Sequence, residues 1–119
     1  MKFHNMNAFI YQSESESRTY FCSYNAIVCV IEHDLPVPCV KFGKYANYSS
    51  TTSKQLTRFL LEFLGMDVPA AKRRKIMANP YVLYHMDGLD FMYTPNADWS
   101  NGINGKYTYP GTRAMACYD

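Results

Sequence analysis

A chain of 119 residues with 48% hydrophobic residues has the usual size of one domain and can fill one hydrophobic core. Charged residues make up only 18%, which argues against an intrinsically disordered chain. Residues 1–10 lack the apolar stretch of a secretory signal, and the longest wholly apolar run, residues 26–31, is far shorter than the ~20 residues that span a bilayer. We therefore expect one intracellular domain over residues 1–119 and no membrane segment.

The first half of the chain has the pattern of short strands. Apolar, aromatic and β-branched residues at Ala8–Tyr11 and Arg18–Tyr24 flank a polar, turn-like stretch, and these two runs can form a hairpin. Ala26–Glu32 is almost wholly apolar, which is typical of a strand buried on both faces. The following segment holds two prolines and must be a connector, after which Cys39–Phe42 can return as a short strand.

The clearest helix signal lies at Thr52–Leu64. Thr52 and Gln55 have the spacing of a capping box, in which the hydroxyl accepts a hydrogen bond from an amide at the start of the helix. Arg58 and Glu62 are spaced as an i,i+4 ion pair, and Gly65 can adopt the left-handed turn that ends a helix. Apolar residues recur with helical spacing on one face: Leu56, Phe59, Leu60, Phe63 and Leu64. The sequence thus predicts an amphipathic helix packed on a sheet.

A second helix is predicted from Asp67, its N-cap, to about Asn79, since Pro80 cannot continue it. Between Lys41 and Lys75 the chain holds eight basic residues and only two acidic ones, which favours a polarised surface. The middle of the predicted helix carries four consecutive cations: Lys72, Arg73, Arg74 and Lys75. Because successive residues turn about 100° around a helix, these cations ring it. Three interpretations stay open: a solvated helix, contact with nucleic-acid phosphates, or contact with an acidic protein.

The last part of the chain combines a hairpin signal with many aromatic residues. Strand-like runs at Tyr81–Met86 and Leu89–Tyr93 flank Asp87-Gly88, a two-residue turn signal. Beyond residue 95 the chain is rich in turn residues, and Lys106–Tyr109 is the stretch there that can add a strand. The aromatic residues either fill the core or form a recognition surface, because Tyr and Trp are frequent binding hot spots. As candidate partner contacts we single out Trp99, Tyr107 and Tyr109.

Together these elements predict an α+β fold. We expect a small antiparallel sheet of about five to six short strands, packed by one amphipathic helix and a second, short basic helix.

Neither the histidines nor the cysteines have the spacing of a metal centre or an active site. The three histidines are far apart, and the four cysteines form no Cys-x-x-Cys pair. Cys22 or Cys29 could supply a thiol nucleophile, but both lie in strand-like runs, where burial raises a thiol pKa. We therefore expect reduced cysteines, no cofactor, no metal, no catalytic residue and no enzymatic activity.

Two stretches of the chain resemble a pattern in small proteins of phages and mobile elements. These stretches are Tyr20–Val28 (YFCSYNAIV) and Tyr48–Leu60 (YSSTTSKQLTRFL). The pattern runs as an aromatic-rich strand with Ser-Tyr, an apolar strand, and a Tyr-Ser-x-Thr-Thr lead into a helix that ends in Phe-Leu. It covers about a third of this chain, roughly Tyr20–Leu64, and Gln55 replaces an expected histidine, which removes one conceivable ligand. The family has no known function, so the resemblance implies context and not chemistry.

Small phage domains without an enzyme signature often inhibit host machinery, and anti-CRISPR proteins are among them. The resemblance therefore implies a non-enzymatic binding protein that occludes a host protein or nucleoprotein complex in the host cytoplasm. The expected contacts are the basic helix and the three aromatic candidates. The first alternative is a small nucleic-acid-binding regulator that uses the basic helix, and the second is a thiol or metal enzyme.

Overall fold

The computed structural model of this chain describes residues 2–4, 7–24, 26–47 and 49–97. The strands are β1 (Ala8–Ser13), β2 (Arg18–Ser23), β3 (Ala26–Glu32), β4 (Cys39–Phe42), β5 (Tyr84–Met86) and β6 (Leu89–Tyr93). The helices are α1 (Ser50–Leu64) and α2 (Ala70–Met77), which lie between β4 and β5 in the chain. The α+β prediction is confirmed, and β3 and β4 have the predicted bounds.

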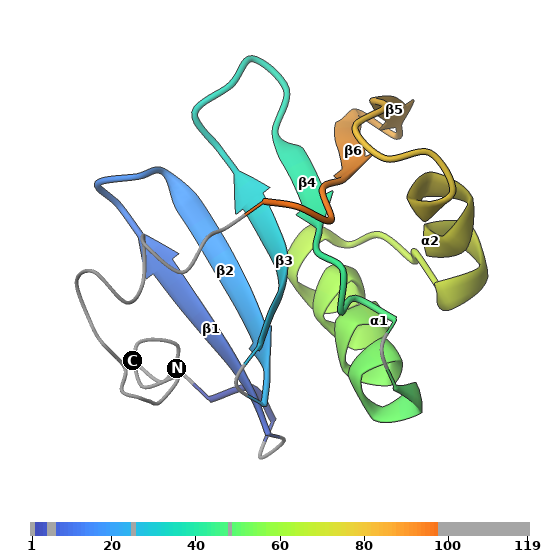
Figure 1. Cartoon of the computed structure of the whole chain (residues 1–119). Coiled ribbons are helices and arrows are strands. Elements are labelled where there is room, and N and C mark those ends of the chain that lie inside the picture. Colours follow the sequence, from blue (N-terminus) through green and yellow to red (C-terminus); the bar gives the residue numbers. More distant parts are fainter. Residues whose placement is uncertain (1, 5–6, 25, 48, 98–119) are drawn as a thin grey trace.

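The six strands form one sheet in the order β1-β2-β3-β4-β6-β5 (Figure 1). Neighbouring strands are antiparallel except for β4 and β6, which run parallel with Val40 opposite Phe91. The sheet is thus mostly antiparallel, as predicted, and the parallel pair is a detail that the prediction did not include. The chain leaves β4 through both helices before it returns, and such a crossover allows parallel pairing.

The hydrophobic core lies between the sheet and the two helices, which are on the same side of the sheet (Figure 1). The rings of Phe21 on β2 and Phe59 on α1 stack with their centroids 4.3 Å apart, and both side chains are fully buried. Ile76 brings α2 onto the same core. The apolar stripe predicted for the first helix therefore faces the sheet. Among the described residues, no helix combines the length and the apolarity that crossing a bilayer takes.

The start of α1 differs from the prediction. Ser49 is the N-cap, because its Oγ accepts a hydrogen bond from the Thr52 amide at 3.1 Å. Thr52 and Gln55 point inward instead, where Ser23 on β2 lies 2.9 Å from the Thr52 hydroxyl and donates to Gln55 Oε1 at 2.7 Å. The predicted capping box is wrong because this buried partner comes from a distant strand. The end of α1 is as predicted: Gly65 has a φ of 70°.

The N-cap assignment predicts opposite glycine and alanine effects at the two candidate positions. Ser49→Ala should lower the free energy of unfolding by about 1 kcal/mol, and Ser49→Gly by only a few tenths, because glycine is tolerated at an N-cap. At Thr52, inside the helix, glycine should instead cost about 1 kcal/mol more than alanine. Urea denaturation of the four variants measures this difference. A greater loss for Ser49→Gly than for Ser49→Ala would contradict the assignment.

The second helix is shorter than predicted at both ends. Pro69 occupies the N-cap position, and no side chain caps this helix, so Asp67 does not have its predicted role. The Arg73 amide donates to the Pro69 carbonyl at 3.0 Å, which places the first turn after the proline. The helix ends at Met77, before Asn79.

The predicted hairpin is confirmed with a shorter first strand. Asp87 and Gly88 have φ angles of 49° and 85°, as a tight two-residue turn between β5 and β6 requires. β5 begins only at Tyr84. Tyr81 before it has a φ of 61°, and its amide donates to the Tyr93 carbonyl at 2.8 Å.

Candidate partner-binding surface on the basic helix

One of the four consecutive cations of α2 is not on the surface. Arg73 is completely buried, and its guanidinium donates five hydrogen bonds. On α1 it reaches the Thr57 hydroxyl at 2.7 Å and both the carbonyl and the hydroxyl of Ser53, at 3.1 and 2.8 Å. It also bonds Asn47 Oδ1 at 2.9 Å and the Val68 carbonyl at 2.7 Å. Arg73 therefore ties α2 to α1 and to the segments that precede both helices.

The environment of Arg73 is unusual for a buried charge because all five of its acceptors are neutral oxygens. Burial lowers the pKa of Arg73 to about 10, and the nearby positive charge of Arg74 acts in the same direction. A pKa of about 10 keeps the guanidinium charged at neutral pH. Burying a charge is costly unless its hydrogen bonds are satisfied. The five bonds offset that cost, so the role of Arg73 is structural and it leaves the set of predicted contacts.

The remaining three cations of α2, Lys72, Arg74 and Lys75, are exposed. None of them forms an ion pair with a described residue. By contrast, the exposed Arg58 of α1 is paired with Glu62 at 2.8 Å, as predicted from the sequence. Figure 1 shows α2 at the outer side of the molecule, next to the β5–β6 hairpin. Within the part of the chain that the structure describes, α2 thus presents three positive charges without an ion-pair partner, and Arg73 holds this helix in place.

The aromatic candidates Trp99, Tyr107 and Tyr109 lie outside the described residues, as does the candidate strand Lys106–Tyr109. The basic helix is therefore the part of the predicted site that the structure places.

A hydroxyl–imidazole contact was not expected from the sequence. Thr19 Oγ1 lies 2.8 Å from Nε2 of His33, just beyond the end of β3. The antiparallel register sets Thr19 opposite Ile31, which brings the side chain of His33 within reach of Thr19. Only the pairing of β2 with β3 could have predicted this contact. The Thr19 residue is only 1% exposed, so its hydroxyl is poorly placed to meet a substrate. The contact joins the ends of β2 and β3.

The described cysteines are in two different states. Cys29 and Cys39 are free and buried, and burial raises the pKa of both thiols, which opposes a role as nucleophile. Cys22, in contrast, is disulfide-bonded, so the expectation of reduced cysteines is wrong for this residue. Sequence spacing alone does not show such pairing. Among the described residues, no three His, Cys, Asp or Glu side chains gather as metal ligands.

The disulfide at Cys22 predicts the number of reactive thiols. Protein purified without reductant and unfolded in guanidinium should show fewer reactive thiols than the four cysteines of the sequence. After treatment with dithiothreitol and its removal, all four should react. A thiol-specific chromogenic reagent measures both values. Four thiols before reduction would contradict the disulfide.

No protein-family model, curated protein or solved structure matches this chain.

Proposed function

We propose that the chain is a non-enzymatic binding protein of a phage or mobile element that inhibits or modulates host machinery by occlusion. It covers a surface of a host protein or nucleoprotein complex, and in the sharpest form of the proposal it is an anti-CRISPR protein. The observation that carries the proposal is the exposure of Lys72, Arg74 and Lys75 on α2 without an acidic partner among the described residues.

Physical chemistry supports a contact at this helix. Long-range attraction between an unpaired positive surface and an acidic partner speeds association, and complementary charges select the partner. Arg73 adds pre-organisation, because its five bonds fix α2 before any partner arrives. The phage context comes from the resemblance of Tyr20–Val28 and Tyr48–Leu60 to small phage proteins.

The test begins with affinity capture of the tagged full chain from infected cells and measures Kd with the purified partner. A triple charge reversal, Lys72→Glu with Arg74→Glu and Lys75→Glu, should weaken binding at least about tenfold, since each close opposite-charge contact becomes a repulsion. The matched control reverses three other exposed cations, Lys2, Lys44 and Lys54. It changes the net charge equally and should leave Kd nearly unchanged. Equal losses in both variants, or none in the first, would exclude α2 as the contact.

The alternative function is nucleic-acid binding, and the same three unpaired cations favour it. Each phosphate that they neutralise releases a counterion, so three contacts give log K a slope of roughly −2.7 against log salt on duplex DNA. Binding of the full chain to a random duplex, measured by fluorescence anisotropy at increasing salt, checks this slope. A flat or absent signal at low salt would contradict nucleic-acid binding and leave the protein partner as the proposal.

A further inference from the structure

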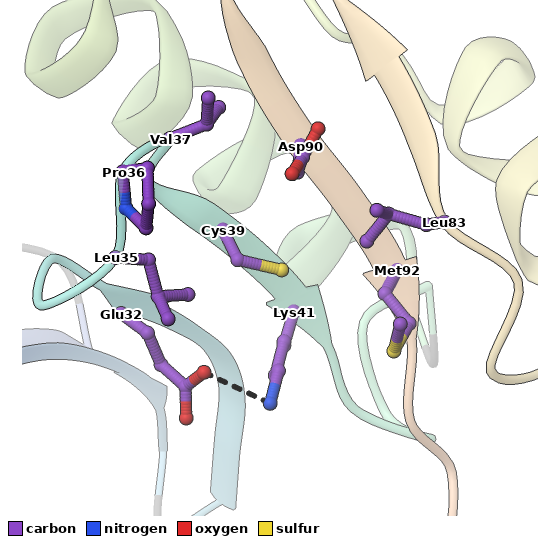
Figure 2. Close-up of a pocket in the computed structure, with 9 residues that line it drawn as sticks. All are labelled: Glu32, Leu35, Pro36, Val37, Cys39, Lys41, Leu83, Asp90 and Met92. Atoms are coloured by element: carbon purple, nitrogen blue, oxygen red, sulfur yellow. Dashed lines mark ion pairs between the residues drawn. The ribbon is translucent and has the colours of Figure 1, made fainter.

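A hollow of about 460 Å³ opens on the face of the sheet that the helices leave uncovered (Figure 2). Successive side chains of a strand point to opposite faces, so Val40 and Phe91 enter the core while their neighbours point the other way. Those neighbours form the floor of the hollow: Cys39 and Lys41 from β4, and Asp90 and Met92 from β6. Such a volume lies within the range of about 300–1,000 Å³ that is typical of ligand sites.

The two walls of the hollow expose apolar side chains. Leu35 in the β3–β4 connector is 47% exposed, and Leu83 on the opposite side is 54% exposed (Figure 2). Leu83 ends a run of six consecutive exposed residues, Ala78–Leu83, whose last four are proline, tyrosine, valine and leucine. Hydrogen bonds hold this run in place, since the Asn96 amide also donates to the Tyr81 hydroxyl at 3.1 Å. A fixed run of exposed apolar residues is unfavourable in water unless it meets a partner.

The charges of the hollow leave one acceptor available. Both oxygens of Glu32 are occupied, by Lys41 at 2.9 Å and by Arg18 at 3.1 Å. Asp90 uses only Oδ1, which lies 2.8 Å from Nδ1 of His85. Among the described residues nothing bonds its second oxygen, and the side chain is 19% exposed. The hollow therefore offers a half-buried carboxylate oxygen beside apolar walls, and this arrangement complements a cation next to an apolar group.

We propose that this hollow is a docking site for an extended segment of a partner protein. The segment places one aliphatic or aromatic side chain between Leu35 and Leu83 and brings a lysine or arginine to Asp90. The exposed run Pro80–Leu83 continues the apolar surface beyond the hollow, which favours a protein segment over a compact small molecule. Because α2 lies on the other side of the sheet, this contact does not depend on the basic helix.

The experiment uses the immobilised full chain and a displayed library of random peptides. Enriched peptides should combine an aliphatic or aromatic residue with a nearby lysine or arginine. The strongest of them, made synthetically, should bind Leu83→Ser and Asp90→Asn each roughly tenfold more weakly than the wild type, because one loses apolar burial and the other the charge. The matched controls are Leu61→Ser, at a leucine that is 50% exposed on α1, and Asp67→Asn. Both should bind the peptide as the wild type does.

Other results would overturn the proposal. These are the enrichment of no peptide, the enrichment of peptides without a cation, and an unchanged Kd for Leu83→Ser or for Asp90→Asn. A wild-type dimer that Leu83→Ser converts to a monomer would show that a second copy of the chain occupies the hollow instead. Because Leu83 is exposed, its substitution should leave the urea midpoint unchanged, which keeps loss of binding distinct from loss of folding.

Discussion

Replacing Arg73 with methionine is expected to lower the free energy of unfolding by about 3 kcal/mol, a large fraction of the roughly 5–15 kcal/mol that stabilises a typical domain. Methionine fills much of the same space but donates no hydrogen bond. The buried oxygens of Ser53, Asn47 and Val68 would each lose a donor. Leaving a buried acceptor without a donor costs more free energy than the lost hydrogen bond had contributed. Arg73→Met should therefore destabilise the fold more than the same substitution at a surface arginine. Urea denaturation followed by circular dichroism measures it.

Two further variants make this prediction specific. Arg73→Lys keeps the charge but should recover less than half of the loss, because an ammonium group cannot reproduce the planar, five-donor geometry of the guanidinium. Arg74→Met, at the exposed neighbour, should change stability by no more than about 0.5 kcal/mol. Equal stability of the Arg73→Met and Arg74→Met variants would show that the buried network contributes little.

Truncation of Phe59 to alanine is expected to cost about 4 kcal/mol, because a fully buried aromatic side chain loses its burial and leaves a cavity. Phe59 stacks on Phe21 and also on Phe63, whose ring centroid lies 5.1 Å away. Together with the equally buried Leu56 and Leu60, it packs α1 against the sheet. The control on the same helix is Leu61→Ala, at a side chain that is 50% exposed, which should cost less than about 0.5 kcal/mol.

A double-mutant cycle separates the contact between Phe21 and Phe59 from their separate burial. Phe21→Ala should cost about as much as Phe59→Ala, and the double variant should cost about 1 kcal/mol less than the sum, since the stacked pair can be lost only once. Thermal and urea unfolding provide two independent measurements. Strict additivity would mean that the stacking of the two rings contributes no energy of its own.

Local patterns were sufficient to predict most of the elements. Ala26–Glu32 and Cys39–Phe42 have the predicted bounds because apolar, β-branched runs between a turn and a proline-rich connector leave few alternatives. Asp87-Gly88 was predicted correctly for a similar reason, since few residue pairs tolerate two positive φ angles. Strand propensity and turn geometry depend on interactions between residues a few positions apart, so they can be predicted from the sequence without knowledge of the fold.

What the sequence did not predict depends on distant partners. Residues 49–52 are all serine or threonine, which favour N-cap positions. The contact with Ser23 on β2 turns Thr52 inward, and Ser49 caps the helix instead. Likewise, nothing in four consecutive cations shows that Arg73 is the buried one. That follows from the positions of Ser53 and Asn47, which lie far from it in the chain. The structure therefore removes Arg73 from the predicted contacts, and a partner contact at the other three cations of α2 stays a prediction.

The parallel pairing of β4 with β6 has a consequence for synthesis on the ribosome. β2, β3 and β4 each pair with the strand that precedes them, so this part of the sheet can assemble as the chain emerges. The second edge of β4, with Val40 and Phe42, has no strand to pair with until everything up to Tyr93 has been made. During that interval an apolar strand edge is open to other nascent chains. Slow translation between the codons of Phe42 and Leu89 should therefore increase aggregation.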